Sequence, residues 1–290
     1  MKTGIRAGVI LSVMALSACT GQGRKEAGER IITVTIEPQR YFTEAIAGDR
    51  FRVVSMVPKG SSPETYDPTP EQLVSLGRSE AYFRIGHIGF ERAWMERLMK
   101  NAPRTQVFDL SKGVAFIHEE GTMHEGHYHA GGVDPHIWNS AVNAGIMAGN
   151  IFRALCVLDK DNEAYYSARR DSLIRRIEET DRIVFNLLKQ DGAGHAFMIY
   201  HPALSYFARD YGLHQICIEE SGREPSPAHL KELIEISTFE DVRVIFVQPE
   251  FDRRNAEVVA KETGTRIVPV NPLSYDWNEE MIHIAKSLGH

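Results

Sequence analysis

The segment DNEAYYSARRDSLIRRIEETDRIVFNLLKQ, from Asp161 to Gln190, contains neither glycine nor proline. Large apolar side chains recur along it at helical spacing, at Tyr166, Leu173, Ile177, Val184 and Leu188. At a rise of ~1.5 Å per residue, one helix over this segment would be about 45 Å long, which exceeds the width of a small lobe. Because arginines and glutamates occupy its other faces, those faces belong in water. The segment therefore predicts a helix that joins two lobes.

Apolar runs and helical patterns alternate on both sides of this segment. The strands predicted before it cover residues 31–36, 52–57, 81–85 and 105–108, and those predicted after it cover 196–200, 215–218, 244–247 and 266–270. Helices are predicted between these strands, which is typical of parallel sheets covered by helices. The predicted fold class is therefore α/β, with two lobes of mostly parallel sheets, a long rigid spine helix joining them, and a ligand cleft between the lobes.

The N-terminus has the features of an export signal. Lys2 and Arg6 precede an apolar core, residues 9–16, that is too short to span a bilayer, and Leu16-Ser17-Ala18-Cys19 follows. This pattern resembles a bacterial lipoprotein signal in which Cys19 is lipidated; an ordinary secretory signal with a chance cysteine is the alternative. We expect an exported protein, lipid-anchored to a bacterial membrane and facing the periplasm or the cell exterior.

The predicted division of the chain follows from these patterns. It consists of a signal peptide (1–18), a flexible spacer (19–30), an N-terminal lobe (31–158) with a histidine-rich loop (118–132), a linking helix (159–190) and a C-terminal lobe (191–290). Loss of Lys2 and Arg6 with the signal moves the formal net charge from −6 to −8. That balance argues against nucleic acid as a partner and suits a cationic ligand. We expect a monomer, with Cys156 and Cys217 as buried thiols rather than a disulfide framework.

Histidines are concentrated in HEEGTMHEGHYHAGGVDPH, which holds five of the twelve in the chain: His118, His124, His127, His129 and His136. Neutral imidazole is a ligand for zinc, copper, nickel and iron, so this density indicates a transition metal. The part from His118 to His129 is polar and interrupted by glycine, and we expect a loop without regular structure there. It is either an auxiliary metal site or a solvated surface loop. His136 differs, because Pro135 stiffens the chain beside it.

Other metal-competent side chains follow predicted strands. Glu64 lies in the loop after the second strand, and His201, Gln248 and Asn271 each directly follow a strand of the second half. Ligands bind beyond the carboxyl ends of the strands in open α/β sheets, so these residues and His136 could face one cleft. Any one of them alone is more often a turn or cap residue.

The chain resembles the zinc/manganese solute-binding proteins of ABC importers. The resemblance rests on PETYDPTP (63–70), DPHIW (134–138), HPALSYFARDYGL (201–213) and EPSP (224–227), and it runs from about residue 31 to the C-terminus. It implies two α/β lobes bridged by a rigid helix, and one metal ion held between the lobes and delivered to a membrane permease with its ATPase. It implies a binding protein rather than an enzyme. Members with a long histidine-rich loop tend to be zinc-selective.

Two positions depart from the family pattern. The family usually has histidine in the slot of Glu64 and aspartate or glutamate in the slot of Asn271, whereas His136 and His201 match. The ligand set carried over is therefore Glu64, His136 and His201, with the fourth position open to Asp276, Gln248, Asn271 or a water molecule.

One carboxylate and two neutral imidazoles leave a divalent ion with a net charge of about +1. This ligand set is compatible with Zn²⁺ and could also take Mn²⁺ or Fe²⁺. The histidine-rich loop favours zinc. An exported zinc-dependent hydrolase has similar ligands, but the chain has no His-Glu-x-x-His sequence and no evident general base.

Overall fold

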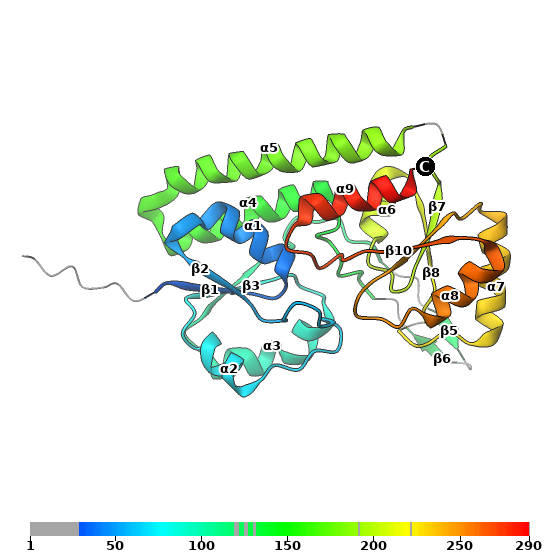
Figure 1. The fold of residues 1–290 in the computed structure, drawn as a ribbon. Helices are drawn as coiled ribbons and strands as arrows, with labels where there is room; N and C mark the ends of the chain where they lie inside the picture. Colours follow the sequence, from blue (N-terminus) through cyan, green and yellow to red (C-terminus); the bar gives the residue numbers. More distant parts are fainter. Residues whose placement is uncertain are drawn as a thin grey trace, which may run out of the picture.

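Two parallel sheets form the centres of two lobes in the computed structural model, and one long helix spans both lobes (Figure 1). The structure describes residues 29–118, 122–124, 127–129, 132–190, 192–220 and 222–289. The predicted signal peptide and Cys19 lie outside these residues. The predicted α/β class, with mostly parallel sheets and a joining helix, is confirmed.

The first lobe has the sheet order β2-β1-β3-β4, with all neighbours parallel. Its strands are β1 (Ile31–Val34), β2 (Arg52–Ser55), β3 (Ala81–Arg84) and β4 (Gln106–Asp109). Its helices are α1 (Glu37–Ala47), α2 (Pro70–Leu76), α3 (Gly89–Asn101) and α4 (Ala141–Leu158), with a short 3-10 turn at Gly48–Arg50. Helices α1 and α4 cover one face of the sheet, and α2 and α3 cover the other (Figure 1).

The second lobe repeats this arrangement with the order β10-β9-β7-β8, again all parallel. Its strands are β7 (Ala196–Ile199), β8 (His214–Cys217), β9 (Val244–Val247) and β10 (Arg266–Pro269). Its helices are α6 (Ser205–Tyr211), α7 (Pro227–Phe239), α8 (Arg254–Thr263) and α9 (Trp277–Leu288). In each sheet the second strand in sequence lies on one side of the first, and the third lies on the other. Each sheet therefore has a topological switch point beside its first strand.

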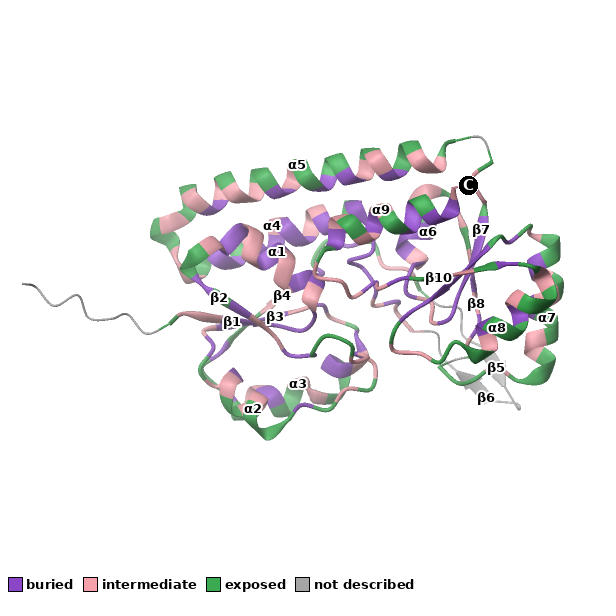
Figure 2. Ribbon diagram, viewed as in Figure 1, coloured by how far each residue is buried: buried purple, intermediate pink, exposed green. Residues whose placement is uncertain are grey.

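The joining helix is α5 (Glu163–Leu188), which follows a 3-10 turn at Lys160–Asn162. It packs on α1 and α4 of the first lobe and on α9 of the second. Its inner face buries Tyr166, Leu173, Ile177 and Val184, while its outer face is largely exposed (Figure 2). The apolar residues recognised in the sequence therefore form the face by which α5 packs on both lobes.

One helix and a pair of short strands were not anticipated from the sequence. Helix α9 buries Trp277, Met281 and Ile284 on one face. The strands β5 (Thr122–His124) and β6 (His127–His129) pair as an antiparallel hairpin, so the expectation of no regular structure in this stretch is wrong for their backbone. The strands are separated in sequence by two residues, the second a glycine, which is typical of a hairpin.

One apolar core runs through both lobes and the helices above them, and a second covers the other face of the second sheet. Helix α4 is long and apolar enough to cross a membrane by length and composition, but half of it is buried in the first core. Cys156 and Cys217 are half-buried rather than fully buried as expected. Within the described residues neither forms a disulfide.

Candidate metal centre

Three of the predicted residues meet between the lobes. Glu64, His136 and His201 each offer one ligand atom, and these atoms all lie within 4.8 Å of one another. Glu64 comes from the loop after β2, His136 from the segment before α4, and His201 from the carboxyl end of β7. Side chains more than sixty positions apart in sequence are thus brought together by the packing of the two lobes.

His136 is oriented by the residues on either side of it. The Oδ1 atom of Asp134 accepts hydrogen bonds from the backbone N–H and from the Nδ1 atom of His136, both at 2.8 Å. Burial opposes ionisation of Asp134, but these bonds hold its pKa below the ordinary value. On the other side, Trp138 is fully buried and its Nε1 donates to the carbonyl of Pro272 at 2.7 Å. The ring is therefore held with Nε2 facing the cavity.

His201 is held in the same way by the second lobe. Its Nδ1 atom lies 2.9 Å from Oε1 of Glu219, a residue just after β8. Gln248 bonds to the His201 backbone twice, with Oε1 accepting from its N–H at 3.3 Å and Nε2 donating to its carbonyl at 2.6 Å. The ring of Phe251 stacks on the imidazole, with centroids 5.3 Å apart. Both polar atoms of Gln248 are thus engaged in positioning His201.

The two imidazoles face each other across a short gap. Their Nε2 atoms are 3.2 Å apart. When each Nδ1–H donates to a carboxylate, each Nε2 carries a lone pair, and carboxylate partners of this kind are usual behind metal-bound histidines. Two nitrogens bound to one tetrahedral zinc at ~2.0–2.1 Å would be separated by about 3.3 Å. The observed spacing therefore suits a metal ion between the rings.

Glu64 reaches this gap because its loop docks on the first turn of α3. The backbone N–H of Gly89 donates to Oε2 of Glu64 at 3.1 Å, and that of Phe90 donates to the carbonyl of Pro63 at 2.7 Å. A Cβ atom at position 89 would lie 2.4 Å from Oε2 of Glu64, so only glycine allows this approach. The Oε1 atom of Glu64 is buried and has no hydrogen-bond partner among the described residues.

A small cavity of about 30 Å³ lies at the meeting point of these side chains. Its lining consists of Ser62, Pro63, Glu64, His136, Trp138, His201, Glu250, Phe251 and Leu273. Glu250 was missed by the sequence argument, which in the second half considered the residue directly after each of three strands. Burial raises the pKa of its carboxyl group, against the opposing effects of its own backbone N–H and of His201.

The structure does not bring Asn271 or Asp276 into this group. The side-chain oxygen of Asn271 accepts from the N–H of Leu273 at 3.1 Å, and Asn271 lines a separate cavity of about 420 Å³ beyond β9 and β10. Asp276 directly precedes α9 and lines a third cavity against α5. In the histidine-rich stretch, His118 is exposed, and the side chains of His124, His127 and His129 lie outside the described residues.

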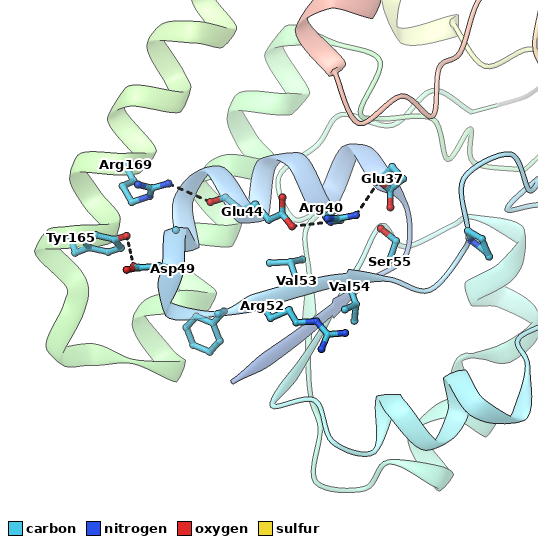
Figure 3. A pocket seen from close by; sticks show the side chains of 13 residues that line it. Glu37, Arg40, Glu44, Asp49, Arg52, Val53, Val54, Ser55, Tyr165 and Arg169 are labelled. Carbon is cyan, nitrogen blue, oxygen red and sulfur yellow. Dashed lines mark hydrogen bonds and ion pairs between the residues drawn. The ribbon is translucent and has the colours of Figure 1, made fainter. Parts of the chain in front are cut away.

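A much larger groove, about 990 Å³, lies between α1 and β2 on the first lobe (Figure 3). Its charges are satisfied locally: Arg40 pairs with Glu37 and Glu44, and the hydroxyl of Tyr165 donates to Asp49 at 3.0 Å. No histidine or cysteine occurs among the described residues that line it. Size alone therefore does not make this groove the better candidate for a metal.

Comparison with known proteins gives consistent matches over nearly the whole chain. The family model described as "Zinc-uptake complex component A periplasmic" matches residues 32–288. The iron ABC transporter substrate-binding lipoprotein MtsA of Streptococcus pyogenes is 29% identical, with 92% of this chain and 87% of the relative covered. The manganese ABC transporter substrate-binding lipoprotein PsaA of Streptococcus anginosus is also 29% identical, with 92% and 88% covered.

Solved structures agree with these matches. A crystal structure of ZnuA superposes with a TM-score of 0.83 at 35% identity, covering 90% of this chain and 98% of the other. The structure of FpvC from Pseudomonas aeruginosa in complex with Mn²⁺ gives a TM-score of 0.77 at 25% identity, covering 90% and 97%.

Proposed function

Because the chain belongs to the family of the zinc-uptake complex component A, whose members are substrate-binding proteins of ABC importers and not enzymes, we propose that it captures Zn²⁺ between its two lobes. The bound ion is then delivered to a membrane permease that works with an ATPase. Binding and release need no chemical step, which accords with the lack of an evident general base in the sequence. An exported hydrolase, the rival considered from the sequence, has no support in these matches.

The observation that carries the proposal is the geometry of Glu64, His136 and His201. Two imidazoles are turned toward each other by carboxylates behind them, with Nε2 atoms 3.2 Å apart, and a buried carboxylate oxygen is close by. Such a set of two nitrogens and one oxygen supplies three ligands of a tetrahedral zinc site, leaving one position. Without a cation, the same groups would concentrate lone pairs and negative charge in a small cavity.

The choice of zinc rests on the nitrogen pair and on the histidine-rich stretch. His118, His124, His127 and His129 would form a weaker auxiliary site that gathers zinc near the cleft. A manganese- or iron-binding protein is the alternative, since the relatives MtsA and PsaA are named for iron and manganese. The carboxylate of Glu64 also suits these harder ions.

The cellular setting follows from the N-terminus. We propose that Cys19 carries a lipid anchor after removal of residues 1–18, as the names of the lipoprotein relatives suggest. The spacer 19–30 would then let the monomeric binding protein reach the permease while it remains attached to the membrane.

Titration with zinc and with manganese in the presence of a competing chelator tests this function. The wild-type protein should bind zinc at one tight site, and Glu64→Ala should weaken zinc binding at least tenfold, which is about 1.4 kcal/mol. Glu64→His should retain zinc binding and lower the affinity for manganese more steeply, because imidazole is a less favourable ligand than carboxylate for the harder ion.

Thermal unfolding gives an independent measurement. A ligand that binds only the folded state stabilises it by ~4 kcal/mol at a thousandfold excess over Kd. Zinc should therefore raise the melting temperature by several degrees, and the rise should diminish below about pH 6 as histidines protonate. A melting temperature unaffected by zinc, manganese and iron alike would exclude metal capture.

A further inference from the structure

Two buried carboxylate oxygens share the small cavity between the lobes. Buried side-chain atoms without a hydrogen-bond partner are few in the described part of the chain, and the carboxylate oxygens among them are Oε1 of Glu64 and Oε1 of Glu250. Both residues line the 30 Å³ cavity that also contains His136 and His201. Buried acceptors are normally satisfied, so two carboxylates that each keep one buried oxygen without a partner in the same cavity indicate a cation site that both line.

Glu250 has no other evident structural role. It does not cap α8, because the backbone N–H of Arg254 donates to Oδ1 of Asp252 at 2.9 Å, and Asp252 also pairs with the Arg254 guanidinium. No ion pair to Glu250 occurs within the described residues. A carboxylate that neither caps a helix nor pairs with a base, and whose burial opposes its charge, is better explained by a ligand.

The chain around Glu250 is tied to one of the metal-facing imidazoles. Gln248 bonds to the backbone of His201, Phe251 stacks on its ring, and the N–H of Phe251 donates to the Gln248 carbonyl at 3.2 Å. Glu250 thus occupies a tight turn whose two flanking residues both hold His201. Its oxygens do not belong to the set within 4.8 Å, so its side chain must rotate inward to reach an ion.

We propose that Glu250 is the fourth metal ligand and moves onto the ion after Glu64, His136 and His201 have bound it. The inference rests on the proposed function. Asn271 lines the neighbouring cavity, where its side-chain oxygen accepts the N–H of Leu273, whereas Glu250 lines the same cavity as the other three ligands. With two carboxylates and two neutral imidazoles, the site would neutralise a divalent ion completely. A second hard oxygen ligand raises the affinity for Mn²⁺ and Fe²⁺ more than that for Zn²⁺.

The test is Glu250→Gln, which keeps the size of the side chain and removes its charge. The matched control is Glu280→Gln in the same lobe; burial also raises the pKa of Glu280, but its oxygen accepts the N–H of Asn271 in the neighbouring cavity. Affinities for zinc and manganese are measured by chelator competition. Glu250→Gln should lower the affinity for manganese at least tenfold and the affinity for zinc by a smaller factor. The control should keep both affinities within twofold of wild type.

The melting temperature of the metal-free protein separates a ligand from a structural residue. Removing a half-buried charge whose Oε1 has no partner should raise the metal-free melting temperature in Glu250→Gln, while the additional stabilisation by manganese should shrink. Unchanged affinities for both metals, or a lower metal-free melting temperature together with lower affinity, would overturn the role of Glu250 alone. If the wild-type protein bound neither metal, the proposed function itself would fall.

Discussion

Gly89→Ala should weaken metal binding although it removes no candidate ligand. The added Cβ would lie 2.4 Å from Oε2 of Glu64, 2.9 Å from its carbonyl oxygen and 3.0 Å from its Cα. Since the optimal van der Waals separation of nonbonded heavy atoms is roughly 3.5 Å, Oε2 would have to move by about 1 Å. Rotation of the side chain would relieve only the first of these contacts. The backbone of the Glu64 loop must therefore shift away from α3.

The expected loss of affinity follows from that displacement. A shift of about 1 Å is half the length of a zinc–oxygen bond of ~2.0–2.2 Å, so Glu64 could no longer bind the ion as it does on the native loop. We expect zinc binding to weaken at least tenfold, about 1.4 kcal/mol, as for Glu64→Ala. In a double-mutant cycle the two changes should be strongly non-additive, because both act through the same carboxylate.

Chelator-competition titration measures this effect, and Gly145→Ala is the matched control. In the interior of α4, a Cβ at position 145 would meet only Cδ1 of Ile174, at an ordinary 3.9 Å. That change should raise the free energy of unfolding by about 0.5–1 kcal/mol through helix propensity and leave affinity unchanged. Wild-type zinc affinity in a folded Gly89→Ala protein would refute the docking of Glu64 on α3.

Three further predictions concern the support of the site, the first lobe and the histidine-rich stretch. Asp134→Asn removes the negative charge behind His136 and should lower metal affinity roughly ten- to hundredfold by the same titration. Burial raises the pKa of Glu91 to about 7, against hydrogen bonds from Thr35 and two backbone N–H groups. The folded state therefore keeps a proton between about pH 4.5 and 7 that the unfolded state has lost, so stability falls as pH rises through this window. Urea unfolding at pH 5 and pH 8 should show that Glu91→Gln removes about 2.5 kcal/mol of this pH dependence. Deletion of residues 119–130 should abolish weak zinc stoichiometry in calorimetry and keep one tight site, whereas loss of the tight site would make the histidine-rich stretch the primary ligand set.

The main elements could be predicted because their signals are local. Thr69-Pro70 marks the start of α2, where the Thr69 hydroxyl accepts from the N–H of Gln72 at 3.3 Å. The uninterrupted stripe of α5 likewise required only helical spacing. Thr69, and not the nearby Glu64, caps this helix; Glu64 accepts a hydrogen bond from the first turn of α3.

Other features depend on packing that a sequence does not display. The backbone pairing of β5 and β6 arises between strands that each have only three residues. Such strands are too short for a pattern of alternating hydrophobicity. Glu250 was missed for a related reason: the turn closed by Phe251 N–H and Gln248 O carries the third residue after β9 to the cavity. The rule that ligands bind beyond the carboxyl ends of strands predicts the edge of the sheet at which the site lies. The conformation of the turn decides which side chain there faces the cavity.

The two lobes show that a polar residue at the end of a strand, such as Gln248, can have a bridging role in the sheet. In each sheet the carboxyl ends of two strands diverge at the switch point, and one buried side chain bridges them. In the second lobe Gln248, at the end of β9, bonds to the backbone of His201 at the end of β7. In the first lobe Glu91 accepts a hydrogen bond from the hydroxyl of Thr35, which follows β1. It also accepts one from the N–H of Ile85, which follows β3, at 2.8 Å.

Both bridging side chains are almost fully buried, Glu91 at 2% exposure and Gln248 at 3%. A polar residue at a switch point can therefore either bridge the two strand ends or contact the ligand. The residue type alone does not tell which role it has. In the first lobe the bridge comes from the first turn of α3, the same turn on which the Glu64 loop docks. In the first lobe Glu91 bridges the strand ends, and the metal-facing carboxylate, Glu64, therefore comes from a loop. The second lobe presents His201 directly from its strand, and so the site is asymmetric although the sheets are alike.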